Sequence, residues 1–516
     1  MTLSPSIDEV PAAHVRRHDE TNILTRSTFS VREITMTSPA LAAVLGLDVG
    51  TGGVRVLAAT PDGNLLAEAQ TPLSDRRGKP PIHEQDPVEW WSAACSTIGR
   101  VTKDLSQVIP LESIQGIAVT STSGSLVLAD VAGQPVRAAI LYDDGRGASI
   151  AKELNRQLPP EDAQFNASYS LIKGAWVRQN EPDVWARTRH ILHPADWLAG
   201  KLTGQFGTSD DSNALKLGHD PDTGCWSRAV SIVNIPRDIL PKVVRPGARV
   251  GAVCARASFE TGLRRGTPVF AGATDGMTGL IASGAREPGQ ANTTLGSTIV
   301  WKVLSRNKLP ASTGVYCHRH PSGLWAPGAA SNSGPGSLHS EGLGVAPSES
   351  DGMAAKHLPT SGLCYLLPSK GERFPFLNAT AETFFEGDTD NPQEAYAAQL
   401  QSLAFVERWG YERLEECGAR VGGEVFTTGT AAASPVLMQL RASVLKREVH
   451  RCHHPTSAFG AAILAACQPL FGGDITSAIQ GMTEVRESFR PESATVGRYD
   501  EIYNSFRAAC ARRGYR

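Results

Sequence analysis

Two short segments, far apart in the chain, follow one plan and restrict the folds that the chain can adopt. Each has an extended apolar or β-branched run, a tight turn of Gly and hydroxyl residues, and a second such run; they span 45–57 and 292–301. Glycine permits positive φ and close approach, so backbone N–H groups and a Ser or Thr hydroxyl in such a turn can converge on phosphate oxygens. Two of these turns facing each other across a cleft would hold a nucleoside triphosphate. The pair therefore points to phosphoryl transfer.

The elements around the first turn predict an α/β domain of the ribonuclease-H-like (actin-like) ATPase type, which begins with three antiparallel strands. The strands expected from the apolar runs are 44–47, 54–59, 65–70, 116–120 and 126–129. The pair Asp62-Gly63 is a strong turn signal between the second and third of them. Asp86 can cap a helix that starts with Pro87 at its first position.

The same plan restarts after position 290, which indicates a coarse internal duplication. A loop-rich stretch, 310–390, is expected after the second turn. The elements expected beyond it are a helix from Asn391, a strand at 424–428, and helices at 434–445 and 457–467. We therefore assign residues 43–288 to an N-terminal domain that binds sugar and phosphate, and 289–516 to a C-terminal nucleotide-binding domain. The polar residues 1–42 are expected to form a disordered leader.

Composition excludes several classes of partner. A chain of 516 residues is too long for one core. Its formal net charge of −2, without a long basic run, argues against nucleic acid or an anionic membrane as partner. No apolar stretch reaches the ~18 residues that a membrane helix needs. The nine cysteines are irregularly spaced and form no C-x-x-C, which favours reduced thiols in a cytoplasmic protein.

Asp48 stands where the first strand meets its turn. A carboxylate there can hold Mg²⁺, usually through water, while Gly50, Thr51 and Gly52 present donors to phosphate. An isolated match of this kind is more often a plain hairpin whose Asp stabilises the turn. Because the chain has no G-x-x-x-x-G-K-[ST] and the turn leads into a strand, a P-loop and a dinucleotide fingerprint are disfavoured.

Asp275 lies between a strand and an Ala/Gly-rich helix. It can cap that helix, or it can act as a general base that accepts the proton of an alcohol attacking the γ-phosphate. Its position shortly before the second turn, with Gly296, Ser297 and Thr298, favours the second role. That turn would close around the γ-phosphate.

The segment 429–434 follows a predicted strand and precedes a predicted helix. Its small residues leave room for an adenine ring between backbone layers, or they form a tight connection and nothing more. Gly429, Thr430 and Ser434 are the candidate nucleotide contacts in this segment.

Several of these segments, taken in order, make the chain resemble the FGGY carbohydrate kinases over roughly residues 43–512. The matching segments are 46–51, 84–91, 194–198, the neighbourhood of Asp275, 295–298, 330–334 and 371–375. The resemblance implies two actin-like domains with ATP and Mg²⁺ in the cleft between them and a sugar beside Asp275. It also implies a small-molecule sugar as partner, and a homodimer is possible within the family's range.

Within the family, segments 209–216, 295–305 and 371–375 are most similar to the D-ribulose kinases of plants and cyanobacteria. In that subgroup an Asp-Gly-Thr-Ser run holds the sugar. It aligns with 120–123 here, so Ser123 carries over and the acidic position is lost. The stretch 142–146 instead resembles the sugar-contacting W-N-D-x-R of xylulokinases, which makes Asp144 a second candidate sugar contact.

The leading hypothesis is an ATP-dependent kinase that phosphorylates the terminal hydroxyl of a ketopentose, D-ribulose before others, with Asp275 as base and Asp48 as metal ligand. The alternatives are a xylulokinase or another FGGY polyol or ketose kinase. An alternative from another functional class is a pseudokinase that binds sugar or nucleotide without catalysis. Segment 429–434 favours it, because this segment lacks two glycines and the lysine of the family pattern G-G-G-A-K-[SN]. The added methyl and hydroxyl groups of this segment can tighten or weaken the slot for the adenine ring, and weakened ATP affinity is the hypothesis to test.

Overall fold

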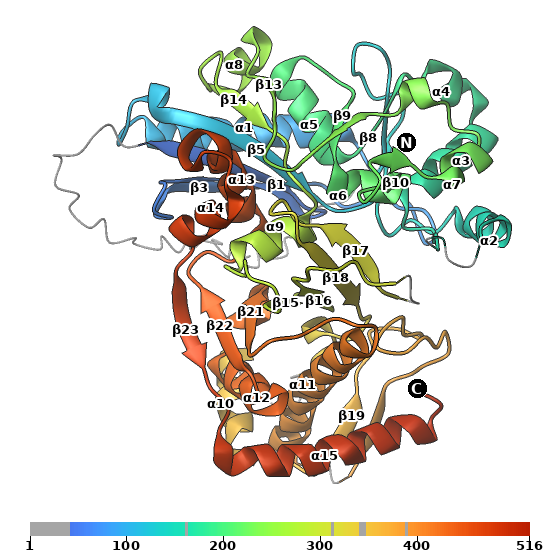
Figure 1. Cartoon of the computed structure of the whole chain (residues 1–516), viewed down its shortest axis with the longest axis vertical. Helices are drawn as coiled ribbons and strands as arrows, with labels where there is room; N and C mark the ends of the chain where they lie inside the picture. The colour runs from blue at the N-terminus through green and yellow to red at the C-terminus, as the bar shows by residue number, and fades with distance from the viewer. Residues whose placement is uncertain (1–41, 160–161, 163, 311–313, 340–346, 388–390) are drawn as a thin grey trace, which may run out of the picture. The chain divides into compact units, whose positions relative to one another are not determined.

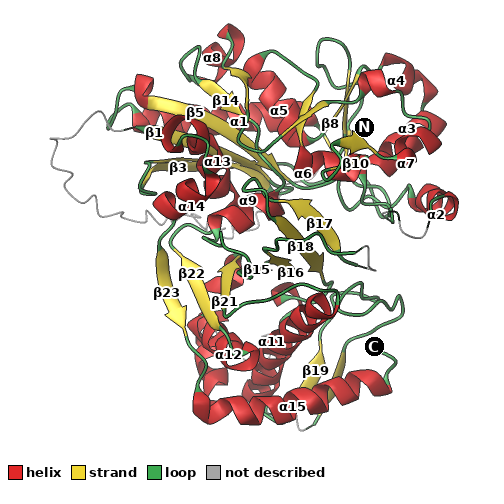
Figure 2. Cartoon of the chain, viewed as in Figure 1, coloured by secondary structure: helices red, strands yellow, loops and turns green. Residues whose placement is uncertain are grey.

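A computed structural model describes residues 42–159, 162, 164–310, 314–339, 347–387 and 391–516 of the chain (Figure 1). All of them belong to one unit that spans 40–516. Except for Ala42, the predicted leader lies outside the described residues. The described part is built around two mixed β-sheets, each flanked by helices (Figure 2).

The first sheet has the strand order β13-β14-β5-β1-β2-β3. Its strands are β1 (Ala43–Val49), β2 (Gly53–Ala59), β3 (Leu65–Pro72), β5 (Ile114–Ser121), β13 (Arg249–Ala252) and β14 (Pro268–Phe270). β1, β2 and β3 are antiparallel neighbours, whereas β5 runs parallel to β1 and β14 parallel to β5. The predicted strand order at the start of the domain is confirmed. The run expected at 126–129 forms β6 (Val127–Ala129), which pairs with β8 (His190–Leu192) outside this sheet.

Helices cover both faces of the first sheet because β1 is apolar on both sides. On one face, Leu45 and Leu47 share a core with α1 (Pro87–Leu105) and α5 (Pro194–Thr203). The Asp86 carboxylate accepts a hydrogen bond from Val88 N, so the predicted cap of α1 is confirmed. On the other face, Val44 packs with α9 (Asp275–Ala282) and α13 (Ser457–Phe471).

The second sheet has the strand order β17-β18-β16-β15-β21-β22-β23. Its strands are β15 (Ala291–Leu295), β16 (Ile299–Val303), β17 (Tyr316–Arg319), β18 (Trp325–Ala330), β21 (Glu424–Thr428), β22 (Glu448–Cys452) and β23 (Val485–Phe489). β15 and β16 are antiparallel, and β21 runs parallel to β15, as β5 does to β1. The sheets therefore repeat one plan, as expected for two actin-like domains.

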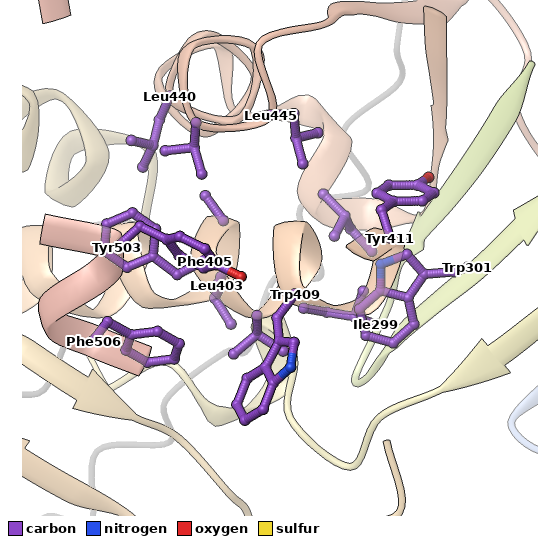
Figure 3. Close-up of a cluster of buried hydrophobic side chains, with 14 of the residues drawn as sticks. Ile299, Trp301, Leu403, Phe405, Trp409, Tyr411, Leu440, Leu445, Tyr503 and Phe506 are labelled. Carbon is purple, nitrogen blue, oxygen red and sulfur yellow. The ribbon is translucent and has the colours of Figure 1, made fainter. Parts of the chain in front are cut away.

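One face of the second sheet rests on a large aromatic core (Figure 3). Trp301 of β16 packs there with residues of α11 (Pro392–Glu416), α12 (Pro435–Leu445) and α15 (Ser493–Arg512). Trp409 of α11 and Phe506 of α15 are fully buried in it. This core fixes the backbone of β15 and β16, and with it the turn between them.

The stretch expected to be loop-rich, 310–390, contains two strands of the second sheet, and that expectation is wrong for these residues. β18 pairs with β16, and β17 pairs with β18 at the edge of the sheet. β17 has only four residues and β18 carries Pro327 and Gly328, so their sequence resembles a loop. The stretch also contains α10 (Pro347–Ala354), β19 (Leu363–Tyr365) and β20 (Phe384–Glu386).

Short elements fill the chain between β5 and β13. Besides β6 and β8 they are β7 (Ala139–Ile140), α2 (Ala148–Gln157), α3 (Ser170–Asn180), α4 (Pro182–Arg187), β9 (Thr208–Asp210), α6 (Asp211–Ala214), β10 (His219–Asp220), β11 (Cys225–Trp226), α7 (Arg228–Ile232) and β12 (Lys242–Val244). Among them, α2, β10, β11 and α7 contribute residues to a cleft between the sheets. β4 (Glu84–Gln85) pairs with β7, and α8 (Ala255–Thr261) follows β13.

α13 comes late in the chain, within 289–516, yet it packs on β1 and β5 of the first sheet; Figure 1 shows it in red beside the blue strands. Glycines permit a close approach on two sides of α13. Towards the sheet, a Cβ on Gly46 of β1 would lie 1.8 Å from the carbonyl oxygen of Ala458; towards α9, a Cβ on Gly460 would lie 1.9 Å from that of Thr278. α14 (Ile475–Met482) follows α13 at a bend of 113°. Over the described residues no single helix is both long and apolar enough to cross a membrane; only this bent pair passes that test, and only by length and composition.

Candidate active site

The first Gly-rich turn lies where β1 joins β2. Gly50 N donates to Gly53 O at 3.0 Å, which closes the turn. Gln85 Nε2 donates to Thr51 O at 2.8 Å, so β4, which directly precedes the cap of α1, holds the turn. Asp48, Gly50 and Gly52 line a cleft between the two sheets, whereas Thr51 does not. A Cβ on Gly52 would meet no atom within 4 Å, so the backbone of the turn is open to a ligand.

Asp275 is the first residue of α9 and lines the same cleft. Its carboxylate accepts a hydrogen bond from Gly276 N at 2.7 Å. The backbone before it is fixed from two sides, because Thr274 N donates to Ser212 Oγ at 2.9 Å and Thr120 Oγ1 donates to Ala273 O at 2.7 Å. The structure thus brings Asp48 and Asp275, from different elements, to one cleft.

Burial shifts the pKa of both carboxylates in the same direction. Burial raises the pKa of Asp48 to about 7, with the nearby Asp275 carboxylate adding to the effect and Arg55 opposing it. Burial also raises the pKa of Asp275, against the hydrogen bond from Gly276 and the charges of Lys216 and Lys302. A cation bound near Asp48 would favour its ionised form and so counter the effects of burial and of the Asp275 charge.

Lys216 and Lys302 are cationic residues of the cleft to which the sequence analysis gave no role. Lys216 follows α6, in the 3₁₀ turn Leu215–Leu217, and Lys302 lies on β16. Burial lowers the pKa of each to about 8, while Asp275 opposes the shift. The signal for Lys302 was present in the sequence, since a lysine interrupts the apolar strand 299–303.

The second Gly-rich turn connects β15 and β16. Gly296 N donates to Thr298 O at 3.2 Å, and Ser297 O accepts a hydrogen bond from Gly336 N at 3.2 Å. The turn therefore packs against the segment 334–336. Gly296, Ser297 and Thr298 do not line the cleft, although Thr294 before them and Val300 after them do.

The segment 429–434 begins at the end of β21. Gly429 has φ +92°, and a Cβ there would lie 2.4 Å from Leu295 O, so glycine is required at this point. Gly429 and Thr430 line the cleft. Ser434 caps α12 and its hydroxyl accepts from Leu437 N at 3.1 Å, so this side chain serves the helix.

Ser123 and Asp144, the candidate sugar contacts, have different environments. Ser123 lines the cleft, its Oγ is buried without a hydrogen-bond partner, and its carbonyl oxygen accepts from Lys216 Nζ at 3.2 Å. The Asp144 side chain is 0% exposed and does not line the cleft. Its oxygens accept from Arg146 Nε at 2.9 Å and Nη2 at 2.7 Å, and from His83 N at 2.8 Å.

The cleft has a volume of ≈ 2380 Å³ and is large enough for a nucleotide and a sugar together. Among the described residues no group of three or more His, Cys, Asp or Glu side chains stands ready to hold a metal. Mg²⁺ beside a nucleotide needs only one or two carboxylates, with water and phosphate supplying the other ligands. Asp48 and Asp275 fit that requirement.

Comparisons with known proteins agree with this arrangement. Models of the N-terminal and C-terminal domains of the FGGY family of carbohydrate kinases match residues 43–282 and 295–468. A xylulose kinase of Staphylococcus epidermidis is 26% identical over 495 residues, 90% of this chain and 96% of the relative. A xylulose kinase of Escherichia coli K12 is 25% identical over 414 residues, 78% of this chain and 84% of the relative. The crystal structure of a xylulose kinase from Rhodospirillum rubrum superposes with a TM-score of 0.81 at 26% identity, covering 91% of this chain and 98% of the other.

Proposed function

Because the chain belongs to the FGGY family of carbohydrate kinases, and is therefore an ATP-dependent sugar kinase, we propose that its acceptor is a ketopentose, D-ribulose before others, phosphorylated at the terminal hydroxyl. The observation that carries the proposal is the Ser123 hydroxyl, which lines the cleft, is buried, and has no partner among the described residues. A buried hydroxyl without a partner costs free energy that a ligand hydroxyl recovers.

Asp275 is the proposed base. Its carboxylate has one hydrogen bond, from Gly276 N, and therefore keeps acceptor capacity for the proton of a sugar hydroxyl. Burial brings its pKa closer to neutral than that of a free Asp, which improves it as a base. Lys216 and Lys302 favour the ionised form, so the carboxylate is ready to accept the proton.

Asp48 is the proposed ligand, directly or through water, of Mg²⁺, which when bound would neutralise charge on the phosphate oxygens. The carboxylate stands at the end of β1 beside the open backbone of Gly50 and Gly52. The phosphates of the nucleotide would then approach this turn. The adenosine end of the nucleotide would rest near Gly429 and Thr430, which also line the cleft.

The choice of D-ribulose over D-xylulose rests on the contrast between Ser123 and Asp144. Ser123 aligns with the last residue of the Asp-Gly-Thr-Ser run of the D-ribulose kinases, whose acidic position is lost here, and its hydroxyl is unpaired at the cleft. Asp144 comes from the stretch that resembles xylulokinases, and Arg146 and His83 occupy its carboxylate. The names of the curated relatives favour D-xylulose, which is the second candidate.

The experiment is an ADP-release assay over D-ribulose, D-xylulose, L-ribulose, ribitol, glycerol and sedoheptulose. The proposal requires D-ribulose to have the highest kcat/KM. Replacing Ser123 by Ala should raise the KM for D-ribulose by about tenfold, because one hydrogen bond to a ligand hydroxyl is lost. The matched control is Ser106→Ala, at the exposed residue that follows α1, and it should leave this KM unchanged. A higher kcat/KM for D-xylulose would select the second candidate.

A further inference from the structure

Lys302 is a buried cation in this cleft that feels the charge of Asp275 but has no hydrogen bond to a carboxylate among the described residues. Its side chain is 2% exposed, and no ion pair within 4 Å involves it among the described residues. Its Nζ donates to His318 Nδ1 at 3.1 Å and lies 5.0 Å from the centre of the Tyr316 ring. Holding an ammonium in such a place is costly unless an anion completes the site. In the free protein the charge of Asp275 offsets only part of the cost of burying this ammonium, and an anionic ligand would complete its site.

The surroundings of Lys302 direct its side chain to the reacting end of the cleft. Along β16, Val300 and Lys302 line the cleft while Trp301 packs into the core behind the sheet. Glycines make room for the stem: a Cβ on Gly328 of β18 would lie 3.1 Å from Lys302 Cγ, and one on Gly276 would lie 3.5 Å from Lys302 Cε. Since Gly276 directly follows Asp275, the ammonium end of Lys302 lies next to the proposed base.

His318 holds this ammonium without competing for charge. Burial and the charge of Lys302 keep the pKa of His318 well below its usual range, so the imidazole is neutral. Its Nδ1 accepts from Lys302 Nζ, which leaves the other ammonium protons free. A neutral acceptor orients the lysine but does not cancel its charge, in contrast to Asp or Glu.

We propose that Lys302, oriented by His318, is a catalytic residue that donates hydrogen bonds to the oxygens of the γ-phosphate and stabilises them during transfer. The proposal rests on the proposed position of the phosphoryl group beside Asp275. The γ-phosphate is the anion that arrives next to that carboxylate in a kinase, and charge spread over its oxygens is what a fixed cation stabilises. Lys216 acts differently, since its Nζ donates to Ser123 O on the sugar side.

The distinguishing experiment measures nucleotide affinity by isothermal titration calorimetry, with ADP and with a non-hydrolysable ATP analogue that has a γ-phosphate. Lys302→Met should weaken the analogue about tenfold or more and leave ADP within about twofold, because only the γ-phosphate loses a charge-assisted contact. With the best sugar of the panel, kcat should fall about 10²–10³-fold while the sugar KM stays within about threefold. Lys302→Arg should recover part of the kcat.

The matched control is Lys370→Met, because Lys370 is an exposed lysine outside the cleft; it should change none of these quantities. Thermal unfolding of the ligand-free protein supplies an independent readout. Removing an unpaired buried charge should leave the Tm of Lys302→Met unchanged or higher. The proposal is overturned if the analogue binds as in the wild type, or if ADP binding and Tm fall together, which is the behaviour of a packing residue. Neither nucleotide titration contains sugar. The two nucleotide affinities can therefore be interpreted even if D-ribulose is not the substrate.

Discussion

Breaking the buried pair of Glu407 and Arg441 should destabilise the second sheet. Arg441 Nε and Nη2 donate to the two Glu407 oxygens at 2.6 and 2.7 Å, and both side chains are 1% exposed. Arg441 Nη1 also donates to Thr427 Oγ1 at 2.8 Å, and Thr293 Oγ1 donates to Glu407 Oε1 at 2.5 Å. The pair therefore joins α11 and α12 to β15 and β21, the strands that lead to the second Gly-rich turn and to Gly429.

The expected magnitude follows from what each substitution leaves behind. Arg441→Met removes three donors and leaves the Glu407 carboxylate buried with Thr293 as its remaining hydroxyl donor. An uncompensated buried charge of this kind costs about 3–5 kcal/mol. For a domain of about 200 residues, that cost lowers the Tm by about 6–20 °C. The double variant Glu407→Leu, Arg441→Met removes both charges and should recover most of the loss.

Differential scanning calorimetry of the wild type, both single variants and the double variant measures the effect as a double-mutant cycle. Arg498→Met provides the control, because the Arg498–Glu501 pair has side chains that are 56% and 69% exposed and should contribute less than about 1 kcal/mol. A Tm for Arg441→Met within about 2 °C of the wild type would refute the reasoning. So would a double variant that is less stable than either single one.

Three further outcomes follow from the site and from the packing around it. Asp275→Asn should lower kcat by at least about 10²-fold while Tm and ADP affinity stay unchanged, and retained turnover would remove Asp275 from the role of base. Because the pKa of Asp48 is raised to about 7, protons compete with Mg²⁺ below that pH; the Mg²⁺ concentration for half-maximal turnover should rise about tenfold from pH 8 to pH 6, and an unchanged requirement would contradict Asp48 as ligand. Gly46→Ala should cost about 1–3 kcal/mol or more, seen as a lower Tm, since its Cβ would lie 1.8 Å from Ala458 O. Gly497→Ala, where no atom lies within 4 Å, serves as its control.

Local signals made much of the fold predictable. The hairpin of β1 and β2, the turn at Gly63 with φ +83°, and the Asp86 cap of α1 depend on residues close together in sequence. The strand order of the second sheet was predictable because it repeats that of the first. The edge strand β17 and its neighbour β18 were not, since a four-residue strand and a strand that contains Pro and Gly depend on pairing with distant partners.

The candidate site was predictable in its acidic residues and not in its basic ones. Asp48 and Asp275 stand at strand and helix ends, where spacing along the chain gives their place. Lys216 and Lys302 reach the cleft from separate elements, and only the folded chain brings both beside Asp275. A resemblance of short stretches gave Asp144 a possible role at the sugar, but it carries no information on the partners Arg146 and His83 that occupy its carboxylate.

The packing of α13 on the first sheet has a consequence for how the protein is made. Val44 of β1 lies in a core that is completed by residues 458–467, which leave the ribosome after nearly all of the second sheet has been synthesised. During translation, the face of the first sheet that α13 covers therefore stays exposed until residues 457–471 have been synthesised. A nascent chain halted before Ser457 should expose that apolar face and depend on chaperones, so folding of the N-terminal half is completed only when synthesis is nearly finished.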